Sequence, residues 1–168
     1  MRDPREVPRS WYQKGVAEED PFNRFISFWL GFSALFNEYM EPRMGERQAI
    51  RKFVSAGRYP DRPDQIKALL EQSAVEFFAS RAIRDARGSG EDTRQDMVVL
   101  RDEQAQPKKR LMALLLILYQ VRCNLFHGSK HYASDSDNEV IKNAATAAGC
   151  AMGHFLDLNQ SQETEICD

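Results

Sequence analysis

Apolar residues along this chain recur mainly at three- and four-residue steps, the spacing of one face of an α-helix. The clearest case begins at Asp20, a good N-cap, followed by Pro21, which suits the first helical position. Pro42 ends the pattern, so we predict a helix over about 21–41. Its apolar face is largely aromatic and is expected to be core: Phe22, Phe25, Ile26, Trp29, Phe32, Phe36, Tyr39 and Met40.

Shorter helical patterns follow. We predict a helix over about 43–56, a proline-interrupted loop over 58–63, and a third helix over about 64–86 that stops at a Gly-Ser-Gly sequence. Residues 88–106 are predicted to be a polar connection, because the apolar run 97–100 within it is too short to define a sheet. The inward positions expected for the third helix are Ile66, Leu69, Leu70, Ser73, Phe77 and Phe78.

The most apolar stretch, 111–119, is apolar nearly all round, which is typical of a central helix rather than a surface one. We expect this helix to start at Pro107. A capping-box sequence, Ser136 to Glu139, then begins a last helix whose inner face is largely alanine, so that it can approach the central helix closely. Together these patterns predict an all-α antiparallel bundle of four to five helices over residues 19–158. Residues 1–18 are expected to be an N-terminal extension with little to bury, and 159–168 a mobile tail.

Size and charge narrow the class of protein. The chain has 168 residues, which fits one domain, and a formal charge of −2, which argues against non-specific coating of nucleic acid but leaves room for a local basic patch. No apolar signal-peptide core follows Met1, and the run 111–119 is about half of the ~20 residues that span a bilayer. Three cysteines in no paired spacing are expected to be reduced thiols. We therefore predict a cytoplasmic protein without a membrane-spanning helix.

The end of the predicted central helix carries the most distinctive polar residues. Arg122, Asn124 and His127 follow the apolar run directly, and Gly128 is the usual kind of residue to stop a helix. Burying an arginine without a partner is costly. Either an anion binds at this site or the site opens to solvent.

These residues resemble a known family. Arg122-x4-His127, followed by Gly128 and Lys130, is similar to the motif of the HEPN (higher eukaryotes and prokaryotes nucleotide-binding) superfamily. The string from Tyr119 to Lys130 and the aromatic segment from Asp20 to Asn37 look most like its Apea-like or abortive-infection-type members, in a resemblance that covers about residues 20–155. Here Cys123 stands where the family often has a polar residue, and the amide follows at Asn124.

The resemblance implies a bundle of four to five helices that dimerises, so that two motifs face each other across a composite cleft. It also implies one of two functions, catalysis or binding. Many catalytic members are metal-independent endoribonucleases in phage defence, toxin–antitoxin pairs or RNA processing, while others are non-catalytic binding modules.

The chemistry of the motif residues is consistent with RNA cleavage. His127 can exchange protons near neutral pH and is assigned as general base or acid, while the Arg122 guanidinium can bind phosphate oxygens and stabilise a phosphorane. Asn124 is assigned as an orienting hydrogen-bond partner. The structural alternatives are an ion pair or helix-carbonyl contact for Arg122, a C-terminal cap for His127, and a packing role for Asn124.

Helix geometry complicates this site within one chain. Five residues rotate a helix by roughly 140°, so Arg122 and His127 do not share a face while the helix stays regular. Either the chain leaves the helix at His127, or a second copy of the chain supplies the other half of the site. We favour an isologous homodimer.

Further cations could bind the RNA backbone. Lys130, Arg47 and Arg51 are the candidate phosphate-binding residues, the last two within an arginine series that also includes Arg43 and Arg58. A solvated face, or ion pairs with another helix, is the alternative for this series. No metal site or cofactor is predicted, because Gly128 should break the helix between His127 and His131 and no third ligand is evident.

The sequence thus predicts a metal-independent endoribonuclease acting on single-stranded or structured RNA at a dimer cleft, in phage defence or a toxin–antitoxin system. An antitoxin or defence-system protein is a candidate partner, and no membrane is expected. The alternatives are an inert module that binds RNA, a nucleotide or a protein through the same cleft, and a purely structural helical dimer.

Overall fold

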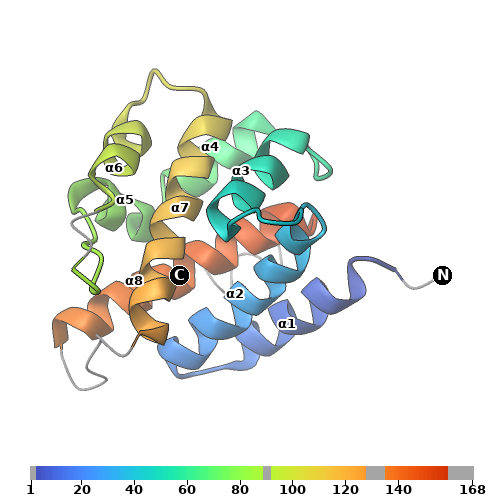
Figure 1. The fold of residues 1–168 in the computed structure, drawn as a ribbon, viewed down its shortest axis with the longest axis horizontal. Helices are drawn as coiled ribbons and strands as arrows, with labels where there is room; N and C mark the ends of the chain where they lie inside the picture. The colour runs from blue at the N-terminus through green and yellow to red at the C-terminus, as the bar shows by residue number, and fades with distance from the viewer. Residues whose placement is uncertain (1–2, 89–91, 128–134, 159–168) are drawn as a thin grey trace.

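The computed structural model describes residues 3–88, 92–127 and 135–158. These residues form eight α-helices and no strand, with one isolated β-bridge between Arg84 and Asp92 (Figure 1). The predicted all-α class is confirmed, although the helices outnumber the four or five expected. Their bounds are α1 Glu6–Ala17, α2 Pro21–Asn37, α3 Glu46–Ala56, α4 Pro63–Leu70, α5 Ser73–Ser80, α6 Arg94–Arg101, α7 Pro107–Phe126 and α8 Asp135–Phe155.

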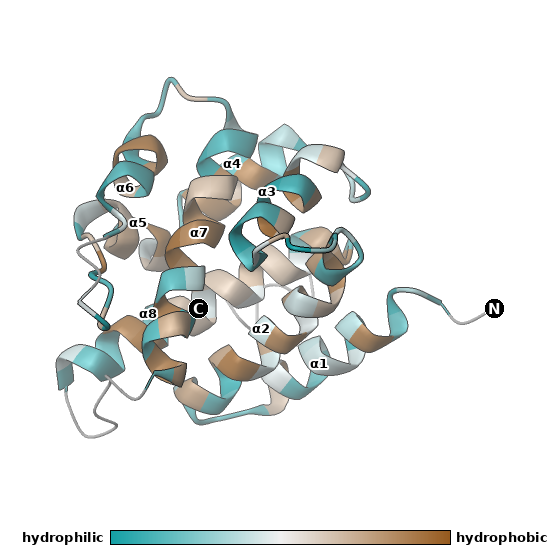
Figure 2. Ribbon diagram, viewed as in Figure 1, coloured by the Kyte–Doolittle hydropathy of each residue, from teal (hydrophilic) through white to brown (hydrophobic). Residues whose placement is uncertain are grey.

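Helix α7 is the central element, as its composition predicts. It runs down the middle of Figure 1, with α5 and α6 on its left and α3 on its right, and it contacts α3, α4, α5, α6 and α8. All residues from Ala113 to Leu118 are buried, so no face of this stretch is exposed to solvent. Polar colour marks the first turn of the helix, over residues 108–110, and returns in its last turns (Figure 2), where the motif lies.

The aromatic face of α2 forms the other half of the core, also as predicted. The ring of Trp29 lies 6.3 Å from the ring of Tyr119 on α7, and Phe32 stacks on Phe155 of α8 with ring centroids 5.7 Å apart. The helix ends at Asn37, earlier than Pro42, because Tyr39 and Met40 donate to carbonyls three residues back and tighten the chain into a turn.

The N-terminal segment differs from the extension with little to bury that we expected. Helix α1 packs along α2, and Tyr12 is buried. The contact depends on a glycine, because a Cβ at Gly15 would lie 2.6 Å from the buried ring of Phe28. Residues 6–17 therefore belong to the bundle, whereas the predicted tail, 159–168, lies outside the described residues.

The predicted third helix is two helices. Glu71 ends α4 and Gln72 adopts an extended conformation before α5 begins. This break rotates the buried face, so Ala74, Val75, Phe78 and Ala79 are buried while Ser73, predicted to point inward, is exposed. Residues 97–100, predicted to lie in a polar connection, belong to α6, which buries Leu100 against the core.

Helix α8 follows its alanine pattern but packs more extensively against α2 than against α7, the partner that we expected. It starts at Asp135, which places Ser136 inside the first turn rather than at the cap. Cys123 is a free thiol but Cys150 is disulfide-bonded, so the expectation of reduced cysteines is wrong at Cys150. Among the described helices, none has the length and apolar character needed to cross a bilayer.

Candidate functional site

The predicted site lies at the C-terminal end of α7, which stays helical through Phe126. His127 is the C-cap, and its backbone N–H donates to the Cys123 carbonyl at 3.1 Å, so its Cα still lies close to the helical path. Gly128 and Lys130 lie outside the described residues. The motif side chains therefore diverge around a regular helix end.

Arg122 is held by a carboxylate from another helix. Its Nη1 and Nη2 donate to Oε2 and Oε1 of Glu46 on α3 at 3.0 and 3.4 Å, a two-point ion pair. Its guanidinium also lies 5.0 Å from the ring centroid of Phe126. The two paired side chains are 26% and 31% exposed, so the pair is partly shielded from water. The ion-pair alternative for Arg122 is what the structure contains.

Glu46 is well placed for this role because it lies in the first turn of α3, where a negative charge interacts favourably with the helix dipole. Sequence reasoning missed it. An acidic residue after Gly45 indicates a helix start, but nothing in the sequence links that residue to Arg122.

Tyr119 lies beside Arg122 on the face of α7 that meets α3. The guanidinium of Arg47, from α3, is 5.6 Å from the centroid of its ring. Burial, the neighbouring Cys123 thiol and the negative charge of Glu46 raise the pKa of Tyr119 to about 12, against the opposing effect of Arg122. Tyr119 is therefore protonated at neutral pH and can act there as a donor but not as a base.

Arg47 and Arg51 lie close to a carboxylate on α6. Burial raises the pKa of Asp96, and the positive charges of Arg47 and Arg51 oppose that shift. This arrangement matches the alternative of pairing between helices more closely than an open phosphate-binding face. The other two arginines of the predicted series are not on α3, since Arg43 precedes the helix and Arg58 follows its end at Gly57.

Asn124 is buried and engaged in packing. Its Oδ1 accepts from the backbone N–H of Ala86 at 3.1 Å and from Nε2 of Gln120 at 3.0 Å, and its Nδ2 donates to the carbonyl of Arg84 at 2.8 Å. The side chain thus fastens residues 84–86 to α7. These contacts agree with the structural alternative for Asn124.

His127 is exposed, and no hydrogen bond or ion pair of its side chain is found among the described residues. Residues three apart on a helix share a face, so His127 lies on the Asn124 side of α7 while Arg122 faces α3. In the described part of the chain, no hydrogen bond or ion pair joins Arg122 to His127. One chain therefore does not bring the two motif groups together.

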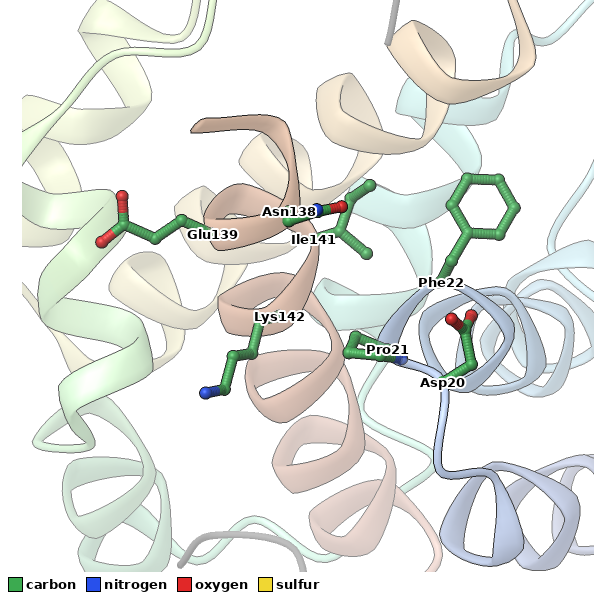
Figure 3. A pocket seen from close by; sticks show the side chains of 7 residues that line it. All are labelled: Asp20, Pro21, Phe22, Asn138, Glu139, Ile141 and Lys142. Atoms are coloured by element: carbon green, nitrogen blue, oxygen red, sulfur yellow. The ribbon is translucent and has the colours of Figure 1, made fainter. Parts of the chain in front are cut away.

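Two open clefts border α8. One, of about 470 Å³, lies between the start of α2 and the first turns of α8, where Phe22 and Ile141 provide apolar walls (Figure 3). The other, of about 320 Å³, is lined by residues 81–84, Ala86, Asn124, Ser136 and Val140. Within the described residues, no group of three His, Cys, Asp or Glu side chains could hold a metal ion.

No family model, curated protein or solved structure matches this chain. The resemblance to HEPN domains therefore stays a prediction from the sequence. Any function must be argued from the geometry of this site.

Proposed function

We propose that this protein is a metal-independent endoribonuclease of the HEPN type whose active site is completed by a second copy of the chain. The observation that carries the proposal is the exposed imidazole of His127 at the tip of the central helix, where it has no partner among the described residues. An imidazole there can reach a ribose 2′-hydroxyl and act as its general base or acid.

Arg122 supplies the cation. Glu46 and the ring of Phe126 fix the orientation of its guanidinium, and about a quarter of its side chain remains exposed. A guanidinium with a fixed orientation loses less conformational entropy when it binds a phosphate. The phosphate must compete with Glu46 for the same N–H groups.

A dimer reconciles the positions of these residues. Arg122 and His127 lie on different faces of the α7 tip, so a two-fold contact between two tips can bring Arg122 of one copy toward His127 of the other. Phe126 supports such a contact, because this residue is 59% exposed at the same tip. An exposed aromatic ring of this kind is typical of an interface.

The remaining predicted residues take secondary roles in this proposal. Asn124 positions residues 84–86 rather than the reacting groups, and Arg47 and Arg51 contribute positive charge that Asp96 partly offsets. Lys130 stays a predicted phosphate ligand. Phage defence or a toxin–antitoxin pair, with an antitoxin or defence protein as partner, is the proposed biological setting.

One observation favours a second function. Because Glu46 already neutralises Arg122, the same surface also suits an inert module that binds RNA, a nucleotide or a protein partner, or a helical dimer without a ligand.

The test is cleavage of a labelled single-stranded RNA in excess EDTA. We expect the purified protein to cleave it, and His127→Ala and Arg122→Gln each to reduce the rate by about 10²-fold or more. Arg9→Ala removes an exposed arginine of α1 that is paired with Asp3; it is the matched control and should be neutral. RNA binding without cleavage in the unaltered protein would favour the inert module, and loss of stability alone in the variants would favour the structural dimer.

A further inference from the structure

The segment between α5 and α6, predicted from the sequence to end the third helix, carries three arginines. Arg81, Arg84 and Arg87 occupy every third position there, and all three are exposed. None of these arginines has a role in the function proposed above. The segment borders the 320 Å³ cleft, and Arg81 and Arg84 line it.

The backbone of this segment is fixed, although it is not helical. Ile83 is buried, and its N–H donates to Oγ1 of Thr93 at 2.8 Å while its carbonyl accepts from the Thr93 N–H at 3.0 Å. Asn124 holds the next residues through Arg84 and Ala86. A surface whose backbone is ordered before binding loses less entropy on binding.

The arginines lie on the His127 side of α7. Asn124 reaches residues 84–86 from the helix, and His127 follows Asn124 by three positions, on the same face. Arg84 and Asn124 both line the cleft, and Asn124 lies one helical turn before the C-cap that carries the imidazole. Arg122 faces α3 instead.

The three arginines differ in how far nearby carboxylates neutralise their charges. Arg84 has no ion pair among the described residues. Arg87 lies 3.4 Å from the buried carboxylate of Asp85, and Arg81 lies 3.8 Å from Glu139, an exposed pair of the kind that contributes little. Figure 3 shows the Glu139 carboxylate pointing away from Phe22.

We propose that Arg81, Arg84 and Arg87 bind the phosphate backbone of single-stranded RNA and guide the strand toward His127, with Asn124 as the positioning residue of this surface. The identity of the ligand rests on the proposed function. Guanidinium groups suit the task because they bind phosphate oxygens with two N–H groups and remain charged at all relevant pH values. Evenly spaced arginines that contact phosphates rather than bases should bind RNA with little preference for its sequence.

The experiment measures binding, not cleavage. Fluorescence anisotropy of a labelled single-stranded RNA is recorded with the full chain in the His127→Ala background, at several salt concentrations. We expect Arg84→Ala to weaken binding about tenfold, the value of one charge-assisted hydrogen bond. Replacing all three arginines should lower the slope of log affinity against log salt by about 0.7 for each phosphate group that the variant no longer binds.

Controls separate this surface from general charge effects. Arg9→Ala removes an arginine of similar exposure on α1 and should leave affinity unchanged, whereas Arg84→Lys should retain most of it. Glu139→Gln removes the carboxylate nearest Arg81 and should tighten binding.

Each outcome bears on one proposal or both. Equal affinity of Arg84→Ala and the parent, or an equal loss with Arg9→Ala, overturns the arginine surface and leaves the nuclease proposal standing. Binding through the arginines by a protein that never cleaves supports the surface and refutes the nuclease. A parent protein that binds no RNA refutes both.

Discussion

Asn124→Ala provides the sharpest test of the packing around the motif. The substitution removes an amide that makes three hydrogen bonds with described residues. The partners are the Ala86 N–H at 3.1 Å, Nε2 of Gln120 at 3.0 Å and the Arg84 carbonyl at 2.8 Å, which lie 38, four and 40 residues earlier in the chain. It therefore detaches the arginine-bearing segment from α7 without altering any charged side chain.

The expected cost follows from those three bonds. A hydrogen bond contributes about 1 kcal/mol, and a buried group left without a partner costs about 1–3 kcal/mol. Gln120 is buried and would lose its partner, whereas water can partly replace the amide at Ala86, which is exposed. We expect a loss of about 3 kcal/mol in the free energy of unfolding. For a chain of this size that loss lowers Tm by about 6–12 °C.

The assay is urea unfolding followed by circular dichroism, with the m-value compared between variants to confirm that only stability changed. Asn143→Ala is the matched control, because its amide donates one exposed hydrogen bond within α8, to the Glu139 carbonyl at 2.9 Å. Its effect should stay within about 0.5 kcal/mol. A loss below about 1 kcal/mol for Asn124→Ala would show that residues 84–86 are not fastened through this side chain.

Three further predictions concern other contacts. A double-mutant cycle with Glu46→Gln and Arg122→Gln, measured by urea unfolding, should give a coupling of about 1 kcal/mol, and zero coupling would show that the pair does not form in solution. Gly15→Ala should cost about 1–3 kcal/mol by overlapping a core phenylalanine ring. Gly45→Ala meets no atom within 4 Å and should cost less, about 0.5 kcal/mol, through its N-cap position; equal effects would contradict the close packing of α1. Burial lowers the pKa of His154 in the folded chain. As pH falls, the unfolded chain therefore binds a proton at this residue at a higher pH than the folded chain does. Stability should therefore fall as pH drops below about 6.5, and His154→Leu should remove that part of the pH dependence. An identical pH dependence in the variant would contradict this reasoning.

The long helices could be predicted because their patterns are strong. Helix α2 carries an aromatic face bounded by an N-cap and a proline, and α7 is apolar nearly all round over residues 111–119. Helix α1 was missed for the opposite reason. Its contact with α2 is made through Tyr12 and through the missing side chain of Gly15, and a glycine adds nothing to a hydrophobic pattern.

Helix α6 and the break between α4 and α5 were missed because each depends on tertiary contacts. Only Leu100 of α6 is buried, so its sequence lacks an apolar face. Leu69 and Leu70 are buried at the end of α4. The extended conformation at Gln72 then turns the chain so that Ala74 and Val75 of α5 are buried as well. A continuous helix would place different residues inward, and the sequence pattern does not distinguish the two arrangements.

At the site, the sequence predicts which residues are unusual but not what they contact. The position of Arg122 and His127 at the end of the central helix follows from the apolar run and is found in the structure. The Arg122 partner, Glu46, lies 76 residues away, and the segment held by Asn124 lies about 40 residues away. Contacts between residues so far apart in the sequence depend on how the helices pack, and the spacing of residues within one helix does not reveal them.

The Glu46–Arg122 pair is the feature on which the choice between enzyme and binding module depends. A phosphodiester carries one negative charge, as the carboxylate does, so replacing Glu46 by RNA at Arg122 exchanges one anion for another with little net change in Coulomb energy. The exchange becomes favourable only if RNA gains contacts elsewhere. His127 at the tip and the three arginines of residues 81–87 are cations or potential cations that Glu46 does not contact, and they lie on the other side of α7. A strand held by those residues would compete for Arg122 at high local concentration, whereas a free phosphate ion would not.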